Sequence, residues 1–98
     1  MAIVELTLVP IGTEETSVSK YVAEASKILE KSNLAYELNP MGTVIEADLD
    51  LAMETIRKMQ EAVFDKGAKR VYSVIKVDDR RDKKASLEQK IKSVRDKM

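Results

Sequence analysis

The chemistry open to this chain is narrow, because its 98 residues include no cysteine and no histidine. Disulfides, thiol nucleophiles, iron–sulfur ligation, His-ligated zinc and Ser-His-Asp catalysis are therefore excluded. Carboxylates, lysines, tyrosines and hydroxyls remain. Glu5 and Glu46 are predicted to lie near each other on a sheet, and paired carboxylates can divide acid and base roles. Since no nucleophile or metal motif accompanies them, we expect a solvated or ion-paired surface pair.

The loop Pro10–Ser17 precedes a predicted helix, whose free backbone amides can hold an anion or the polar edge of a ligand. Gly12 and the hydroxyl groups allow close backbone approach. Glu14 and Glu15, however, oppose a phosphate, and the Walker pattern is absent. From the residues alone, this segment is expected to be an ordinary start of a helix.

A second segment, Asn39–Thr43, carries the sequence NPMGT and is followed by Glu46. Gly42 is expected to supply the positive φ that a tight hairpin needs. Thr43 and Glu46 are three residues apart on a strand, so their side chains point to opposite faces. They could share a ligand only at a bulge or at the rim of the sheet. Periodicity alone therefore predicts a turn here.

The elements that would position these residues follow from apolar periodicity and from turn and cap signals. Alternating apolar residues predict strands, and apolar residues at helical spacing predict helices. Asp50 is expected to cap the second helix, and Lys66 with Gly67 to end it. The predicted order is a strand at Ala2–Val9, a helix at about 17–32, strands at Leu34–Asn39 and Thr43–Leu49, a helix from Asp50, a strand at Arg70–Val77 and a final helix at about 85–97.

This order, βαββαβ followed by a helix, predicts one α+β domain over residues 1–98 with a ferredoxin-like sandwich fold. Right-handed crossovers place the first and third strands in the centre of the sheet and both main helices on one face. The final helix has a narrow apolar stripe that is too small for a stable lone helix. We therefore expect it to dock on its own domain or on a neighbouring chain.

The other face of the sheet is predicted to stay free of helices and to carry apolar and charged residues together. Its apolar members would show on the order of 500 Å² of surface, as much as the functional patch of a typical monomer. A mixed face of this kind favours self-association that leaves a partly polar pocket. The apolar members are Ile3, Val9, Val44, Tyr72 and Val74.

Seventeen basic residues balance seventeen acidic ones, giving a formal net charge of zero. This balance argues against binding to nucleic acids or to anionic membranes, which requires a basic excess. Neither a signal peptide nor an apolar run of about 20 residues is present, so we expect a cytoplasmic protein. Heavy charging without cysteine or tryptophan is also typical of thermophiles.

Almost the whole chain, about Ala2 to Lys97, resembles a family of small ferredoxin-like proteins described as thiamine-binding or hydroxymethylpyrimidine-binding domains. Each matching motif is short, and their order and spacing together carry the resemblance. The motifs are Pro10-Ile11-Gly12, Ser17-Val18-Ser19 with Tyr21-Val22, Tyr36 through Pro40-Met41-Gly42-Thr43 and Glu46, Arg70-Val71, and Lys76 through Arg80.

The resemblance implies reversible binding of a thiamine-type pyrimidine without catalysis, as a sensor or carrier, with no metal and no cofactor. It also implies assembly through the sheet into a homotetramer, a dimer of dimers. A carboxylate, here Glu46, would anchor the exocyclic amine of the ring. The implied ligand-binding residues are Ser17, Met41, Gly42, Thr43 and Glu46, together with Asp79 and Arg80.

Ala47 departs from the family pattern, in which glycine is expected, and its methyl group is expected to narrow the pocket. The alternative function is a structural or regulatory homo-oligomer that recruits a protein partner without a vitamin ligand. An acylphosphatase-like enzyme is discounted, because the loop Pro10–Ser17 contains no arginine. RNA recognition is discounted as well, because Tyr72 alone supplies too few aromatic rings on the central strands.

Overall fold

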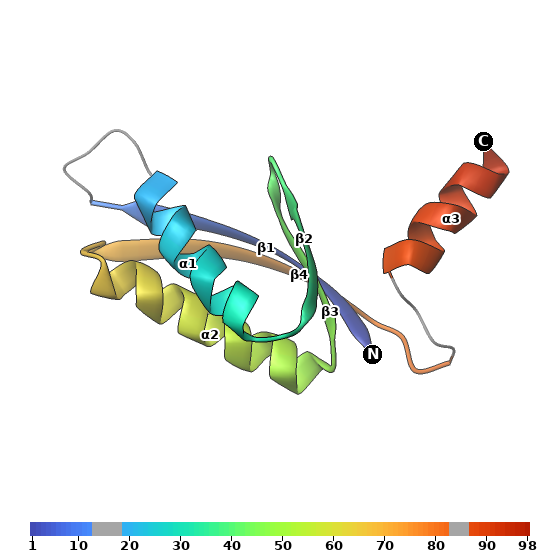
Figure 1. Cartoon of the computed structure of the whole chain (residues 1–98), viewed down its shortest axis with the longest axis horizontal. Coiled ribbons are helices and arrows are strands. Elements are labelled where there is room, and N and C mark those ends of the chain that lie inside the picture. Colours follow the sequence, from blue (N-terminus) through green and yellow to red (C-terminus); the bar gives the residue numbers. More distant parts are fainter. Residues whose placement is uncertain (13–18, 83–86) are drawn as a thin grey trace.

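The computed structural model describes residues 1–12, 19–82 and 87–98. The elements follow the predicted order of four strands and three helices within these ranges, and the fold is α+β and ferredoxin-like (Figure 1). Their bounds are β1 Ala2–Ile11, α1 Ser19–Lys31, β2 Ala35–Asn39, β3 Gly42–Ala47, α2 Leu49–Asp65, β4 Arg70–Asp79 and α3 Leu87–Lys97.

The described strands form one antiparallel sheet in the order β2-β3-β1-β4. This confirms that the first and third strands are central, as right-handed crossovers require. Helices α1 and α2 lie together on one face, which leaves the other face of the sheet open (Figure 1). The register places Ile3 opposite Glu46 and Glu5 opposite Val44, so these four residues share the open face, as the alternation predicts.

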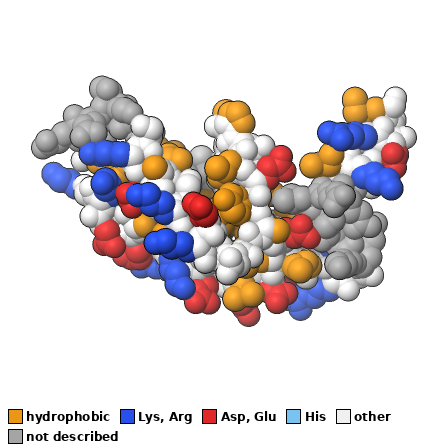
Figure 2. Space-filling view, viewed as in Figure 1, with side chains coloured by type: hydrophobic (Ala, Val, Ile, Leu, Met, Phe, Trp, Pro, Cys, Tyr) orange, Lys and Arg blue, Asp and Glu red, His pale blue; other side chains and the backbone are white. Residues whose placement is uncertain are grey.

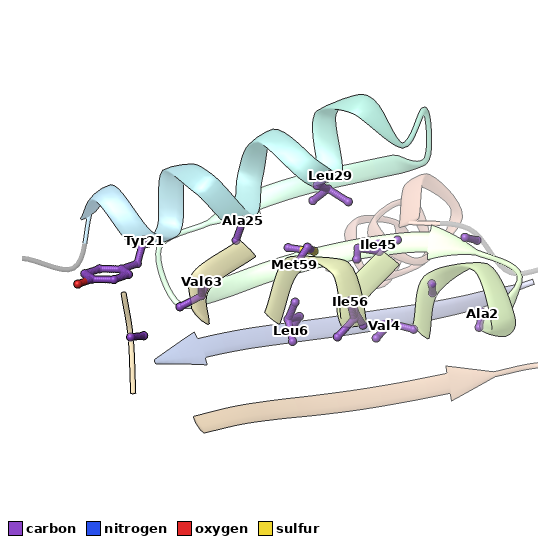
Figure 3. Packing of buried hydrophobic residues seen from close by; sticks show 13 residues of the cluster. Ala2, Val4, Leu6, Tyr21, Ala25, Leu29, Ile45, Ile56, Met59 and Val63 are labelled. Atoms are coloured by element: carbon purple, nitrogen blue, oxygen red, sulfur yellow. The ribbon is translucent and has the colours of Figure 1, made fainter. Parts of the chain in front are cut away.

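The hydrophobic core lies between the sheet and the two helices (Figure 3). Alternate residues of the central strands, among them Val4 and Ile45, are fully buried there. Helix α2 contributes Ile56 and Val63, and α1 contributes Leu29. Because each element buries one face only, apolar periodicity alone locates this core.

Several element ends differ from the sequence prediction. Strand β1 continues through Pro10, which is buried, to Ile11. A proline is tolerated in a strand where one side has no partner, and the pairing of β1 with β3 has already ended at Leu6. At the end of β3, Leu49 belongs to α2 rather than to the strand. The N-cap is therefore Asp48, not Asp50, and its side chain makes no capping hydrogen bond.

The C-terminal end of α2 agrees with the prediction, because Gly67 has a φ of +122° directly after the cap residue Lys66. Asn33, just after α1, likewise takes a positive φ of 61°. Both are positions where the left-handed conformation ends a helix. The turn into β2 and the turn into β4 are thus set by local sequence.

Strand β2 is more exposed than its alternation predicts. Tyr36 and Leu38 do lie on the helix-facing side of the sheet, but Leu38 is 57% exposed. In Figure 1 the β2–β3 hairpin stands away from α1 and α2, so no helix covers this part of the sheet. Alternation thus predicts correctly which face Tyr36 and Leu38 point to, but it does not report how far a helix covers that face.

Gly42 serves a different purpose from the predicted one, since its φ is not positive. A Cβ atom at this position would lie 3.1 Å from the backbone oxygen of Leu6 and 3.1 Å from the Oγ1 of Thr7. Both distances are shorter than ordinary contacts. Gly42 is therefore required for the close approach of the hairpin to β1, not for turn geometry.

Helix α3 lies apart from the sheet and the other helices (Figure 1). Lys90 of α3 forms an ion pair with Asp78 of β4. Ile91 and Val94 are exposed. In the part of the chain that the structure describes, packing of α3 on its own domain is therefore not observed, and docking on a neighbouring chain stays a prediction. Among the described residues, no helix combines the length and the apolar character needed to span a membrane.

Replacing Gly42 by alanine should lower the free energy of unfolding by about 1–3 kcal/mol, the usual cost of inserting a methylene into a packed region. The methyl group would press on backbone, which cannot rotate away. Met41→Ala, at the next and highly exposed position, is the matched control and should change stability by no more than about 0.5 kcal/mol. Urea titration of both variants checks this, and equal stabilities would contradict the close-approach argument.

Candidate functional site

A cavity forms where the central strands differ in length. The pairing of β1 with β3 ends at Leu6 opposite Thr43, but β1 continues beside β4 as far as Ile11. Among the described residues, no strand pairs with the β3 side of β1 beyond Leu6. The space beside that free stretch is closed by the first turns of α1 and by the tip of the β2–β3 hairpin.

The cavity has a volume of about 170 Å³. An apolar protein cavity of about 150 Å³ holds one benzene ring, whereas sites for drug-sized ligands occupy about 300–1,000 Å³. The cavity therefore has room for one six-membered ring. Its lining residues come from β1 (Leu6, Thr7, Leu8, Pro10), from α1 (Tyr21, Val22, Ala25, Ser26), from the hairpin (Asn39, Pro40, Met41, Gly42, Thr43) and from α2 (Met59, Val63).

The polar groups of the lining are neutral. They are the hydroxyls of Thr7, Tyr21, Ser26 and Thr43 and the amide of Asn39. The described lining residues include no Asp, Glu, Lys or Arg. Hydroxyls both donate and accept hydrogen bonds, and an amide offers two donors beside an acceptor. Such a lining suits an uncharged ligand whose edge alternates donors and acceptors.

Tyr21 belongs both to the hydrophobic core and to the lining of the cavity. Its side chain is only 4% exposed, and it lies at the end of the cluster of buried residues in Figure 3. The ring extends beyond Val63, with the hydroxyl directed away from the other labelled residues. The nitrogen of Lys20 lies 5.2 Å from the ring centroid, within the range of a cation–π contact. The buried ring of Tyr21, with its terminal hydroxyl, thus forms one wall of the cavity.

The position of the hairpin tip is fixed by one long-range hydrogen bond. The hydroxyl of Thr7 donates to the backbone carbonyl of Met41 over 3.0 Å. Together with the close contact at Gly42, this bond sets the distance between the hairpin tip and β1. Thr7 thereby determines the width of the cavity at its hairpin end.

The rim of the cavity is apolar and exposed. Val22 of α1 is 48% exposed, and Met41 at the hairpin tip is 85% exposed. In the space-filling view, hydrophobic side chains gather along the upright hairpin (Figure 2). Methionine is flexible and polarizable, so it can adapt to a flat ring. The rim can therefore cover a ligand that enters from solvent.

The structure brings together three of the seven site residues implied by the resemblance. Met41, Gly42 and Thr43 all line the cavity. Ser17 lies outside the described residues. The segment that periodicity alone identified as a turn is indeed a hairpin turn, with Asn39 paired to Gly42. It is at the same time one wall of the cavity.

Glu46 is not brought to this cavity. It lies on the open face of the sheet, opposite Ile3 on one side and Ala35 on the other, while Thr43 faces the helices. This follows from the alternation of side chains along β3. Glu5 lies on the open face too and pairs with Lys76 over 3.6 Å, in agreement with an ion-paired surface carboxylate. Glu46 therefore needs a separate test from Thr43.

The remaining implied residues lie at the other end of the sheet. Asp79 is opposite Ala2 and contacts Arg81 over 3.3 Å. Arg80 makes two hydrogen bonds to Asp82, and these raise the pKa of the guanidinium above its ordinary value. Neither Asp79 nor Arg80 is part of the cavity lining.

The expectation for Ala47 was wrong. Its methyl group is buried in the core and lies opposite Ala2, at the end of β3 away from Thr43. Ala47 therefore does not narrow the cavity. The expectation assumed that Ala47 lies near the ligand because it is close to the motif in the sequence. In the extended strand, five residues separate Ala47 from Met41 at the hairpin tip.

Sequence reasoning assigned no ligand contact to Tyr21, Ser26 or Leu8. Tyr21 belongs to the buried, apolar side of α1. Leu8 packs beside the core as a partly buried residue. These core positions become cavity walls because β3 begins only at Gly42 and leaves β1 beyond Leu6 without a β3 partner. In the sequence, Gly42 marks the place where the hairpin approaches β1 closely. Its distance from Thr7, however, follows from the strand register, which the sequence pattern does not give.

Comparisons with known proteins agree with one another. The model of a family described as thiamine-binding protein matches residues 4–95. A UPF0045 protein of Methanothermobacter thermautotrophicus is 48% identical over 99 residues and covers 100% of both chains. A UPF0045 protein of Bacillus subtilis is 50% identical, covering 96% of this chain and 94% of its own. The crystal structure of a hypothetical protein of Methanocaldococcus jannaschii superposes with a TM-score of 0.87 at 36% identity, covering 95% and 94% of the two chains.

Replacing Thr7 by valine should loosen the hairpin tip without unfolding the sheet. The change keeps the side-chain volume but removes the donor to the carbonyl of Met41, a neutral hydrogen bond with a net contribution of about 1 kcal/mol. Amide hydrogen exchange at Met41–Thr43 should become roughly fivefold faster. Exchange at Val4 and Ile45 in the core is the internal control, and uniform acceleration at all these positions would contradict a local role.

Proposed function

The chain belongs to the family described as thiamine-binding proteins, and on that basis we propose that it binds a thiamine-type pyrimidine reversibly without catalysing a reaction. The observation that carries this proposal is the single-ring cavity of about 170 Å³ beside the free edge of β1. Its lining and its size both suit one polar heteroaromatic ring. The protein would act as a sensor or carrier for this compound.

The chemistry of an aminopyrimidine fits the lining. The ring has apolar faces and an edge of alternating nitrogen acceptors and amine donors. Met41 and the ring of Tyr21 can pack against the faces of the pyrimidine. The hydroxyl of Thr43 and the amide of Asn39 can form hydrogen bonds with the nitrogen atoms at its edge. Backbone groups on the free stretch of β1 add further donors and acceptors of fixed position.

The size of the cavity favours the isolated pyrimidine over a larger ligand. A second ring, as in thiamine, would have to extend past the exposed rim at Val22 and Met41 into solvent. A phosphate would meet no lysine or arginine among the described lining residues. We therefore propose hydroxymethylpyrimidine as the preferred compound and thiamine as the weaker ligand.

Calorimetric titration with hydroxymethylpyrimidine tests this proposal. Thr43→Val should weaken binding roughly fivefold, because it removes one neutral hydrogen bond at nearly constant volume. Glu46→Gln should leave the affinity unchanged, because Glu46 lies on the other face of the sheet. It is the matched control on the same strand.

The possible outcomes separate the alternatives. Binding that depends on Glu46 and not on Thr43 would move the site to the open face. No heat at millimolar hydroxymethylpyrimidine or thiamine would contradict the ligand proposal and favour a structural homo-oligomer that recruits a protein partner. Thermal shift with the same compounds gives an independent reading, since a bound ligand raises the melting temperature.

We also propose that the open face of the sheet mediates part of an assembly into homotetramers, as dimers of dimers. Val44 lies near the centre of that face, between Glu37 and Glu5 across the sheet. Val74 and Tyr72 of β4 are exposed on the same face. Apolar and charged residues alternate there, so the contact would be partly polar.

Replacing Val44 by lysine should reduce the assembly by at least one step, from tetramer to dimer, at micromolar concentration. The variant would bury an unpaired charge if the face is covered. Light scattering measures the mass of the species. Lys58→Glu on the outer surface of α2 is a control for a surface charge change. A wild-type chain that scatters as an 11 kDa monomer would contradict the proposed assembly.

A further inference from the structure

The lining of the cavity changes in character from its rim to its inner end. At the rim, the hairpin residues Asn39–Met41 and Val22 of α1 are exposed. At the inner end, the side chains of Leu6, Met59 and Val63 line the cavity and are at most 3% exposed. A ring in this cavity therefore has an outer end beside polar and apolar groups together, and an inner end against purely apolar side chains.

We propose that Met59 of α2 is a specificity-determining residue of this site. Its side chain would be the end stop for the inner end of the bound ring, and it would limit the substituent there to a methyl group. The proposal rests on the proposed function, the binding of a pyrimidine in the cavity. It narrows the ligand class to aminopyrimidines that carry a small apolar group at the end of the ring opposite the rim.

The orientation of the ring follows from the shape of the two candidate ligands. Hydroxymethylpyrimidine carries an amine at C4, the hydroxymethyl group at C5 and a methyl group at C2. In thiamine, the second ring is attached through the carbon on C5, and the cavity has room for this ring only beyond the rim. One orientation for both compounds therefore turns C5 to the rim. Since C2 is para to C5, the methyl group on C2 faces the inner end.

This orientation also places the polar groups of the ring consistently. C4 is adjacent to C5, so the amine lies toward the outer part of the cavity, where Asn39 and Thr43 supply hydrogen-bonding groups. At the inner end, an oxygen on C2 would meet the side chains of Leu6, Met59 and Val63, which offer no hydrogen-bond donor. The hydroxyl of Tyr21 is directed away from Met59 and Val63 (Figure 3). Burying an unpaired carbonyl is unfavourable, so the site should reject pyrimidines of the cytosine type.

Among the inner residues, Met59 has the side chain best suited to measure the length of a substituent. Val63 is branched at Cβ, which restricts its rotamers. Met59 is unbranched, and its terminal methyl can adapt to a neighbouring atom. It belongs to the buried cluster of Figure 3 together with Leu29 and Ile56. Because such interiors are close-packed, a group longer than methyl at C2 could enter only by displacing the side chain of Met59.

Calorimetric titration of the natural chain with a series of compounds tests the orientation without any variant. Exchanging the C2 methyl of hydroxymethylpyrimidine for propyl should weaken binding about tenfold or more, because the inner end becomes overpacked. A propyl ether on the C5 hydroxymethyl group should change the affinity by less than about threefold, because its alkyl chain leaves past the rim. 5-Hydroxymethylcytosine, with oxygen at C2, should bind at least about tenfold more weakly. Equal losses at C2 and C5 would contradict the orientation.

Met59→Ala tests the residue itself, because it removes every side-chain atom beyond Cβ. The ratio of the affinities for the propyl and methyl compounds should shift about tenfold or more toward propyl, since each methylene that fills the void strengthens binding about fourfold. A general loss of stability would lower both affinities alike and leave this ratio unchanged. Met59→Leu, a swap that cores tolerate, should keep the natural preference for methyl. Met53→Ala, at an exposed position of α2 outside the lining, is the matched control.

The outcomes separate this inference from the proposed function. If hydroxymethylpyrimidine itself produces no heat, both are contradicted. If it binds and Thr43→Val weakens it, but Met59→Ala leaves the ratio of propyl to methyl affinity unchanged with the circular dichroism of the fold retained, the proposed function stands and the role of Met59 is contradicted. Should Met59→Ala fail to fold, the compound series on the natural chain decides, and tolerance of propyl at C2 there overturns the proposal.

Discussion

The functional geometry of this molecule depends on one mismatch of length between its two central strands. Strand β1 pairs with β4 over ten residues but with β3 only as far as Leu6 and Thr43. The hairpin tip is then held against β1 by the hydrogen bond from Thr7 to the carbonyl of Met41 and by the close approach at Gly42. Since backbone groups in a sheet normally have partners, a stretch of strand without one beside a held hairpin is a natural place for a ligand.

The character of the cavity follows from the elements that border it. Three of its walls are parts of the core, so they supply apolar side chains such as Leu8 and Met59, and the hairpin supplies short polar groups. Its charged neighbours, Glu5 and Glu46, belong to the open face and are separated from it by the sheet itself. A small neutral site on one face and a mixed apolar and charged face on the other can therefore serve different roles, ligand binding and assembly.

Most of the fold could be predicted from the sequence, because apolar alternation and helical spacing each report a buried face. The order of elements, the central strands and the ends at Asn33 and Gly67 all follow from such local signals. Features set by the lengths of neighbouring elements could not be predicted in this way. They include the exposure of Leu38, which depends on where α1 lies, and the late start of β3 at Gly42, which makes Tyr21 a cavity wall. The motif resemblance grouped Met41–Thr43, which line the cavity, with Glu46, which the alternation of β3 turns to the other face.

The central claim is that the ligand occupies the space beside the free stretch of β1. Amide chemical shifts of isotope-labelled protein, recorded during titration with hydroxymethylpyrimidine, test this claim at every residue in one experiment. The account predicts shifts concentrated at Leu8, Tyr21 and Asn39–Thr43, and none at Asp79 or Arg80 at the far end of the sheet. Shifts centred on Glu46 and the open face, with Leu8 and Tyr21 unchanged, would contradict it.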